Sequence, residues 1–518
     1  MFKGFKVLQA VALSSLLVTV ASACGSNNGE NQASSSAPSG ASSPAAAESP
    51  TADTPKPTLK RLGVWQDSDY NNYPVAKMLE EETGYKVQYD MLPQDKAADK
   101  LNLLLASGDA YDIVNYNSDM ALYSDYAQKG ALTDLTPLIE QYGPNITQSV
   151  SQQSLDALKV DGKLYAIPTK VTYQVNSSIL IRTDWLDKVG MPMPTTTDEL
   201  TAVLRAFKEQ DPGGNGDNDV PLTINGDQAM LDNLVGAFGM ANTWNDVDGQ
   251  LVSRIMDPAY KDYVGYLSGL YQEGLLDREF VVNKGATTKE KFTSGRAGAI
   301  VVHWADFAGI VEALTKNIPD AQISFVGALK GPNGEAGFVA NVGFDRLTFI
   351  PKASKHPDDA IKWINATLEP ETFKKLAIGE EGVHYTEENG AYLPILPLFN
   401  DERNLANNFM SGVDEKLYPL YWQARAHKNP VQFEAFDFLN NKQPDEVKIP
   451  NLLSLAPYMP VHAKNNMQLE SMVTDYTIKL IAGAEPMSGL EAFQAKYQAA
   501  GGEASAKEIN DWYATVQK

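Results

Sequence analysis

Two hydrophobic periodicities alternate along the chain from residue 58 onward. The segments 58–66 (TLKRLGVWQ), 85–92 (YKVQYDML) and 111–116 (YDIVNY) have the short apolar runs of β-strands. Between them, the segments 73–84 and 96–109 carry apolar residues at helical spacing. This βαβαβ succession requires right-handed crossovers, so it predicts a mostly parallel sheet with a crevice at the carboxyl ends of its strands.

The same alternation continues to the end of the chain. Strand-like segments flank residues 170–176 (KVTYQVN), and a helix with threonine caps and an acidic first turn is expected over 195–210. Further strands are expected at 163–169, 177–186, 295–307 and 323–329, and further helices at 356–369, 370–379, 466–483, 490–502 and 505–517. The pattern predicts an α/β fold, without an internal repeat, a heptad array or a later membrane-spanning stretch.

Length and charge narrow the class of protein. A chain of 518 residues favours two or more domains. The formal net charge is −22 at pH 7, with a sequence pI near 4.7. Nucleic-acid binders attract phosphates through a surplus of Lys and Arg, so this composition argues against a nucleic-acid partner.

The N-terminus has the pattern of a processing signal. Lys3 and Lys6 precede the apolar stretch 7–20, which is too short to span a bilayer comfortably and is followed by Ala-Ser-Ala-Cys. Cys24, the only cysteine, resembles the lipidated residue of a bacterial lipoprotein, which implies a signal peptide over 1–23 and diacylation of this thiol. An ordinary cleaved secretory signal is the alternative. A single cysteine also excludes an intramolecular disulfide framework and a cysteine-rich zinc site.

Residues 24–57 are expected to form a flexible tether. After Cys24 this segment contains no large apolar side chain and is rich in Ser, Ala and Pro. Such a segment can bury too little apolar surface to offset the conformational entropy that it would lose on ordering. The tether would lift a globular body off a membrane.

The order and spacing of several motifs resemble the extracellular solute-binding proteins of carbohydrate ABC importers, in particular a long lipoprotein branch of Gram-positive bacteria. The motifs are Cys24, LNLLLASGDAYDIV, DGKLYAIP, LIRTDWLDKVGMPMPTTTDEL, FTSGRAGAIVVHWADF, GEEGVHYTEENG and the late NDWY. They extend over nearly the whole chain from residue 60. Each motif is weak alone, and their common order makes the match strong.

The resemblance implies a periplasmic-binding-protein fold with two discontinuous α/β lobes and a ligand cleft between them. By analogy with maltose-binding relatives, the chain would cross between the lobes near residues 172, 328 and 380. The N-terminal lobe would comprise 58–172 and 329–380, and the C-terminal lobe 173–328 and 381–518. Residues 170–176 would then form a hinge strand, and the lobes would close over the ligand.

The resemblance also implies a function. The protein would be lipid-anchored on the extracellular face of the membrane as a monomer, would capture an oligosaccharide, and would deliver it to the transmembrane subunits of an ABC permease. Ligand would favour the closed form through its higher affinity for that form. The same fold with a peptide or another small solute as ligand remains the alternative.

Candidate ligand-binding residues follow from the resemblance and from the chemistry of sugar recognition. Sugar pockets combine flat apolar surface for the C–H faces of the rings with fixed hydrogen-bond partners for the hydroxyls. The candidates are Trp65, Tyr70, Asn117, Asp119, Lys170, Tyr173, Trp304 and Tyr385. Trp304 is similar in position to an aromatic residue that stacks on sugar in maltose-type binders.

Several candidates have a structural alternative. Trp65 would otherwise pack against the surface between the lobes, Asp119 would cap the following helix, and Tyr385, like His384, would belong to a structural turn. The tryptophans expected in the core are Trp185, Trp363 and Trp512. The roles of Trp244 and Trp422 stay open, although Trp422 follows a Tyr-rich run that can line an extended cleft.

The loop 208–223 (KEQDPGGNGDNDVPLT) follows the register of an EF-hand calcium loop in part. The candidate ligands are Asp211, Asn215, Asp217 through its main-chain carbonyl, and Asp219, with Gly216 at the turning position. Gly213 and Leu222 cannot supply the two missing ligands. Related alginate-binding proteins have a similar loop that holds calcium. A Gly/Asn turn without metal is the alternative, and a bound calcium would stabilise the loop rather than catalyse a reaction.

No catalytic constellation is apparent, so we expect a binding protein rather than an enzyme, with no required cofactor. The five histidines lack zinc-ligand spacing, and neither a G-x-S-x-G elbow nor a P-loop occurs. A carbohydrate-active enzyme remains the least favoured alternative, because two carboxylates from distant positions can meet in a fold.

Overall fold

The computed structural model describes residues 55–517. The predicted signal peptide, Cys24 and nearly all of the tether therefore lie outside the described residues. Of the helices in 55–517, none has the length and apolarity needed to cross a membrane.

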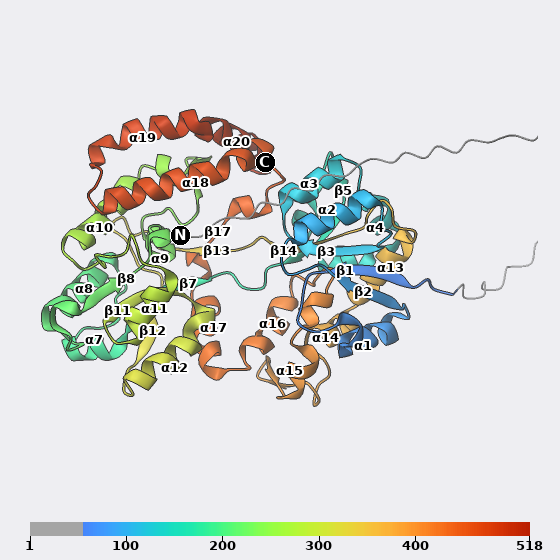
Figure 1. Ribbon diagram of the computed structural model, residues 1–518, viewed down its shortest axis with the longest axis horizontal. Coiled ribbons are helices and arrows are strands. Elements are labelled where there is room, and N and C mark those ends of the chain that lie inside the picture. The colour runs from blue at the N-terminus through green and yellow to red at the C-terminus, as the bar shows by residue number, and fades with distance from the viewer. Residues whose placement is uncertain (1–54, 518) are drawn as a thin grey trace, which may run out of the picture. The chain divides into compact units, whose positions relative to one another are not determined.

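The first sheet contains the predicted βαβαβ unit. Its spatial order is β2 (Val87–Met91), β1 (Leu59–Gly63), β3 (Ile113–Asn117), β14 (Phe344–Phe349) and β6 (Ala166–Lys170) (Figure 1). Strand β1 is parallel to β2 and β3, as predicted, whereas β14 is antiparallel to β3 and β6. Helix α1 (Pro74–Thr83) buries Val75, Leu79 and Thr83, which share one face because they are four residues apart.

The second sheet has four strands of mixed direction. Its order is β12 (Ile323–Phe325), β7 (Ser177–Arg182), β11 (Ala297–His303) and β8 (Val220–Thr223). Strand β7 is antiparallel to both β12 and β11, and β11 is parallel to β8. The burial pattern of β11 is nearly continuous, as expected for a central strand covered on both faces.

Four two-stranded sheets and the remaining helices complete the fold. The small sheets pair β4 (Lys159–Val160) with β5 (Lys163–Leu164), β9 (Trp244–Val247) with β10 (Gln250–Ser253), β13 (Phe338–Ala340) with β17 (Lys448–Pro450), and β15 (Tyr385–Glu388) with β16 (Ala391–Pro394). The other α-helices are α2 (Ala97–Ser107), α3 (Met120–Gln128), α4 (Thr136–Tyr142), α5 (Pro144–Ser149), α6 (Gln152–Asp156), α7 (Thr183–Val189), α8 (Thr197–Gln210), α9 (Asp232–Ala237), α10 (Tyr260–Gln272), α11 (Gly285–Thr293), α12 (Phe307–Asn317), α13 (Pro357–Thr367), α14 (Pro370–Ile378), α15 (Leu398–Arg403), α16 (Tyr418–Ala426), α17 (Pro430–Asn440), α18 (Pro460–Ile481), α19 (Leu490–Tyr497) and α20 (Glu503–Val516).

Each large sheet has its own buried apolar core. The core around the first sheet draws its residues from 59–167 and 347–424. The second sheet is covered on one side by residues from 179–329 and 469–497, and on the other by a cluster that includes Leu180, Ile300 and residues of α17. The molecule therefore contains two α/β halves, each assembled from separate stretches of the chain.

The chain crosses between the two halves in irregular segments. It leaves β6 after Lys170 and enters β7 at Ser177, so the first crossing lies close to the predicted residue 172. It returns between Ala340 and Phe344, where β13 ends and β14 begins, rather than near 328. The sequence between 329 and 340 stays with the second half, because Leu329 and Phe338 pack in its clusters.

The third crossing lies within α16 rather than near 380. Ala424 packs in the first core, whereas Ala426 packs in a cluster of the second half. Residues 381–424 stay with the first half because Tyr385, Phe399 and Phe409 are buried in its core. The hairpin β15–β16 and helices α15 and α16 thus extend the first half beyond the predicted boundary.

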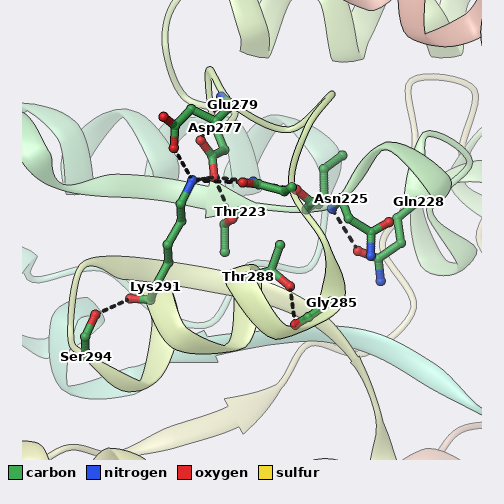
Figure 2. A network of polar contacts seen from close by, with 11 residues as sticks. Thr223, Asn225, Gln228, Asp277, Glu279, Gly285, Thr288, Lys291 and Ser294 are labelled. Carbon is green, nitrogen blue, oxygen red and sulfur yellow. Dashed lines mark hydrogen bonds and ion pairs between the residues drawn. The ribbon is translucent and has the colours of Figure 1, made fainter. Parts of the chain in front are cut away.

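A buried network of polar side chains joins β8 to α11 in the second half (Figure 2). Lys291 Nζ donates to Asp277 Oδ2 and Glu279 Oε2, each at 2.8 Å, and to Asn283 Oδ1 at 3.1 Å. Asp277 Oδ2 also accepts from Thr223 Oγ1 at 2.7 Å. The side chains of Lys291 and Asp277 are both 3% exposed. Burial alone would lower the pKa of Lys291, but its bonds to Asp277 and Glu279 raise that pKa, so the ammonium stays charged.

Removing the ammonium should destabilise the second half, because Asp277 would remain as an unpaired buried carboxylate. We expect Lys291→Met to lower the free energy of unfolding by about 3–5 kcal/mol, the usual range for removing one partner of a buried pair. Lys289→Met on the same helix breaks the exposed Lys289–Asp306 pair and should cost less than about 1 kcal/mol. Urea titrations followed by circular dichroism would measure both; equal losses would contradict a stabilising role for the buried network.

Candidate functional site

A pocket of about 410 Å³ lies where the first and second crossings of the chain meet. Its lining residues come from both halves of the fold. They are Ser118, Thr169, Lys170, Val171, Thr172, Tyr173, Asn176, Asn341, Phe344, Asp345, Asn407, Tyr418 and Trp422. We call this the crossing pocket.

Hydrogen bonds within the protein hold the main chain at this pocket. The Val171 N–H donates to the Gly343 carbonyl at 3.1 Å, and the Asn341 N–H donates to the Gln174 carbonyl at 2.9 Å. The two crossings are therefore joined directly. Asn440 Oδ1 also accepts from the Gln174 N–H at 3.0 Å. These bonds fix the positions from which the side chains of the crossing pocket project.

Aromatic rings form one side of the pocket. The rings of Tyr173 and Trp304 pack edge to face at 5.4 Å and 88°, and those of Trp304 and Trp422 at 6.0 Å and 88°. Trp304 packs in the same way against Phe436, and only 6% of its surface is exposed. Edge-to-face packing gives a rigid cluster and leaves Tyr173 and Trp422 to line the pocket.

Four buried polar atoms at or beside the crossing pocket have no hydrogen-bond partner among the described residues. They are Thr169 Oγ1, Asn176 Oδ1, Trp304 Nε1 and Glu415 Oε1. The other carboxylate oxygen of Glu415 lies 3.4 Å from Lys170 Nζ, and its side chain is 9% exposed. A buried polar atom without a partner costs about 1–3 kcal/mol. Such atoms also occur elsewhere in the protein, for example Trp363 Nε1, but those of Thr169 and Asn176 belong to residues that line a pocket, where a ligand can supply the partner.

Burial also sets the protonation of the pocket. It raises the pKa of the Tyr173 hydroxyl, and the nearby Asp345 carboxylate raises it further. Burial lowers the pKa of His303, whose ring packs against Tyr173. At neutral pH, Tyr173 is therefore a protonated hydroxyl and His303 an uncharged ring.

A second, larger pocket of about 890 Å³ shares Lys170 with the first. We call it the C-terminal pocket, because α20 and the segment before α18 form much of its wall. Its lining residues are Gln153, Asp156, Ala157, Lys159, Lys170, Val342, Pro450, Leu452, Leu455, Pro457, Trp512, Tyr513 and Val516. Most of this lining is apolar, which suits the C–H faces of a ligand.

The structure brings three of the predicted ligand residues together. Lys170 and Tyr173 line the crossing pocket, and Trp304 lies behind Tyr173. Trp304 presents little free surface, so its ring supports the pocket wall rather than forming an open stacking surface.

Trp65, Asn117 and Asp119 lie outside the linings of both pockets. Trp65 is 40% exposed after β1, and Asn117 is exposed at the end of β3. Asp119 caps α3, because its Oδ1 accepts from the Leu122 N–H at 3.0 Å. The structural alternative for Asp119 is therefore observed.

Two predicted ligand residues are buried in the first core. Tyr70 is 1% exposed, and its hydroxyl donates to the Val64 carbonyl at 2.8 Å. Tyr385 is 3% exposed and packs edge to face on Tyr392 at 5.4 Å. Both rings are buried in the first core, and neither lines the crossing pocket or the C-terminal pocket. The extension of the first half through residues 381–424 accounts for this burial, because Tyr70 packs against Phe409 of the extension and Tyr385 belongs to it.

Sequence reasoning missed most of the polar lining. Thr169, Asn176 and Asn341 of the lining, and Glu415 beside Lys170, belong to none of the family-like motifs, and only the fold brings them together. Trp422, whose role the sequence left open, lines the crossing pocket. Trp185 and Trp363 are fully buried, as expected, whereas Trp512 is only partly buried and lines the C-terminal pocket.

The candidate calcium loop brings two carboxyl groups into contact. Asp211 has a left-handed backbone with φ 48°, and its Oδ1 accepts from the Gly216 N–H at 3.0 Å. Asp219 Oδ1 accepts from Asn215 Nδ2 at 2.6 Å. Burial, together with the contact to Asp211, raises the pKa of Asp219 to about 6. Asp217 is exposed in the short helical turn between these residues. A proton or a cation between the two carboxyl groups would therefore make their contact more favourable.

The rest of the loop offers less than a complete EF-hand site. A Cβ on Gly213 would lie 2.5 Å from both Trp185 Cζ2 and Asp219 Oδ1, so no side-chain ligand fits there. Leu222 is fully buried in β8. The described residues contain no group of three or more His, Asp or Glu side chains placed as metal ligands. The loop fits a cation only in part, with water required for the remaining positions.

Three relatives resemble the chain over different extents. It is 37% identical over 257 residues to an uncharacterised protein in the butB 5′ region of Niallia circulans. The aligned residues make up half of this chain and all of the relative. It is 27% identical to the lipoprotein LipO of Bacillus subtilis, over 89% of this chain and 93% of LipO. It is 29% identical to the fructooligosaccharide ABC transporter substrate-binding protein FusA of Streptococcus pneumoniae, over 58% of this chain and 59% of FusA.

Solved structures share the fold. An extracellular solute-binding protein from Bifidobacterium longum subsp. infantis matches with a TM-score of 0.67 and 21% identity, over 89% of this chain and 99% of that chain. The alginate-binding protein AlgQ2, solved without calcium ion, matches with a TM-score of 0.61 and 20% identity over the same shares. The architecture is therefore the solute-binding-protein fold that the sequence predicts.

A family model places these likenesses in one group. The model of the bacterial extracellular solute-binding proteins matches residues 75–382, more than half of the chain. The family is one of binding proteins, and its match includes the first two crossings and much of the crossing-pocket lining. The chain belongs to the bacterial extracellular solute-binding proteins.

Proposed function

We propose that the protein captures an oligosaccharide at the crossing pocket and the adjoining C-terminal pocket, without altering it chemically. The proposal is supported by membership of a solute-binding family and by the likeness to FusA, which is named for fructooligosaccharide. The aromatic wall of Tyr173 and Trp422 suits the apolar faces of sugar rings.

The observation that carries the proposal is the group of unpartnered buried polar atoms beside this aromatic wall. Asn176 Oδ1 and Glu415 Oε1 can only accept hydrogen bonds, Trp304 Nε1 can only donate, and Thr169 Oγ1 can do both. A sugar hydroxyl both donates and accepts, so it matches each of these atoms chemically; Thr169 and Asn176 belong to the pocket lining itself. Satisfying them on binding removes the cost of leaving them unpaired.

Calorimetry against a panel of oligosaccharides and a panel of short peptides tests this function. We expect saturable binding of a saccharide, with no shortened product in the mixture after incubation. Asn176→Ala should weaken that binding by roughly tenfold, the usual value of one hydrogen bond to a ligand. Asn400→Ala, at an exposed position of α15, is the matched control and should leave the affinity unchanged. Saturable binding of peptides alone, or cleavage of the saccharide, would refute the proposal.

We further propose that the protein is a monomer held on the extracellular face of the membrane through diacylated Cys24. In that position it would deliver its ligand to the transmembrane subunits of an ABC permease. Anchoring is supported by the Ala-Ser-Ala-Cys sequence that ends at Cys24, which resembles that of bacterial lipoproteins, and by the likeness to the lipoprotein LipO. Two acyl chains are sufficient for stable attachment.

Replacing Cys24 by Ser should release the protein from the membrane. We expect wild-type protein in the membrane fraction of expressing bacteria and Cys24→Ser protein in the soluble extracellular or periplasmic fraction. Immunoblots of the separated fractions would measure the distribution. An unchanged membrane fraction for the variant would contradict anchoring through this thiol. Copurification of permease subunits with the saccharide-loaded wild-type protein would test the delivery step.

We also propose that the loop 211–219 binds a structural calcium ion. Asp211, Asn215 and Asp219 would hold it through their side chains, and Asp217 would hold it through its main-chain carbonyl. The ion would neutralise the facing carboxyl groups of Asp211 and Asp219 and stabilise the loop. It would take no part in ligand chemistry.

Calcium should therefore raise the melting temperature of the purified protein. A ligand that binds only the folded state at about 100 times its Kd stabilises that state by about 2.7 kcal/mol. We expect a rise of several degrees in millimolar calcium compared with a chelator. Asp219→Asn should abolish the rise, whereas Asp320→Asn, at an exposed position remote in sequence, should preserve it. The same melting temperature for the wild type with calcium and with chelator would show that the loop holds no ion.

A further inference from the structure

The Lys side chains that line the two pockets are neutralised by neighbouring carboxylates. Among the described residues, only Lys159 and Lys170 bring a lysine or arginine side chain to either lining. Lys159 Nζ lies 2.7 Å from Asp156 Oδ1, and Lys170 Nζ lies 3.4 Å from Glu415 Oε2. His303, behind the aromatic wall, has its pKa lowered by burial and is uncharged at neutral pH. Neither lining therefore presents an unpaired cation.

The remaining charge of the pockets is negative, and two of the unpartnered atoms, on Glu415 and Asn176, can only accept hydrogen bonds. Glu415 keeps one buried carboxylate oxygen unpartnered, and Asn176 keeps its amide oxygen unpartnered. Asp345 adds an exposed carboxylate to the crossing-pocket lining, and its Oδ2 lies 3.4 Å from Arg346 Nε. Such acceptors require donors from the ligand, and a hydroxyl or an amide N–H supplies one.

A carboxylate on the ligand would be poorly matched to this environment. It can only accept hydrogen bonds, so it would compete with Glu415 for Lys170, or with Asp345 for the neighbouring Arg346. Carboxylate recognition in proteins ordinarily uses an Arg fork or a Lys that is free to pair with it. The protein's formal charge of −22 adds long-range repulsion to the same effect.

We propose that the ligand is a neutral oligosaccharide and that the pockets select against acidic, uronate-containing ones. This inference rests on the proposed function and names its substrate class. Neutral hydroxyls satisfy the unpartnered atoms of the lining residues Thr169 and Asn176, and the apolar wall of the C-terminal pocket receives the faces of further rings. The Lys170–Glu415 pair is the selecting element, because Lys170 is the one lysine or arginine of the described residues in the crossing-pocket lining and Glu415 already occupies it, with its second oxygen buried and unpartnered.

Calorimetry with matched pairs of saccharides tests the selection. Each pair shares ring and linkage and differs in charge: galacto- and galacturono-oligosaccharides, manno- and mannurono-oligosaccharides, and tetragalacturonate with its methyl ester. We expect the neutral member of any pair that binds to be at least about tenfold tighter, since the acidic member leaves a charged group without a partner. A uronate member that binds as tightly as its neutral counterpart, or more tightly, would overturn the inference while leaving the proposed function intact. Failure of all saccharides of both kinds would refute the proposed function itself.

Glu415→Gln tests whether the ion pair is the source of the selection. The substitution frees Lys170 and removes one negative charge, so the preference for the neutral member should shrink by roughly tenfold. Glu81→Gln breaks an exposed Lys–Glu pair of α1 and is the matched control, for which the preference should not change. An unchanged preference in folded Glu415→Gln protein, verified by circular dichroism, would contradict the role given to this pair. The wild-type panel decides the substrate class even where that variant does not fold.

Discussion

A buried polar atom must find a hydrogen-bond partner, and this requirement governs the centre of the molecule. Where the chain crosses between its two halves, the main-chain groups of Val171, Gln174 and Asn341 are satisfied within the protein. The side-chain atoms Asn176 Oδ1 and Glu415 Oε1 are not. The protein thus satisfies these main-chain groups itself and leaves the two side-chain oxygens without a partner, which a ligand can supply. Since leaving such atoms unpaired costs free energy, a ligand that satisfies them gains affinity from the architecture itself.

Much of the fold follows from the sequence because it depends on local periodicity. The parallel order of β1, β2 and β3 is what the βαβαβ pattern predicts, and it needs only short connections and right-handed crossovers. The later crossings were predicted less well. Residues 381–424 have the pattern of ordinary helices and a hairpin, and nothing local shows on which core they pack. That choice depends on tertiary contacts such as those of Tyr385 and Phe399.

Residues of the candidate site could be predicted from the sequence only where they lie at a strand end or at a crossing between the halves. Lys170 and Tyr173 adjoin the predicted first crossing and do line the pocket. Tyr70 and Tyr385 looked equally suitable, because aromatic residues near turns pack in cores as readily as they bind sugar. Asn176 lies in the predicted hinge strand but was not singled out there, and Glu415 carries no signal in the sequence, since a single Asn or Glu is common and acquires a role only through its burial. The calcium loop shows the intermediate case, in which a motif is recognisable but Gly213 and Leu222 leave it incomplete.

The central claim is that a hydroxyl-rich ligand completes the hydrogen bonds of the crossing pocket. A crystal structure of the protein with a bound saccharide tests it most directly. The account predicts ligand density beside Tyr173 and Trp422, with hydroxyls within hydrogen-bond distance of Asn176 Oδ1 and Glu415 Oε1. Density for the saccharide elsewhere on the protein, with these two oxygens still unpartnered, would contradict it.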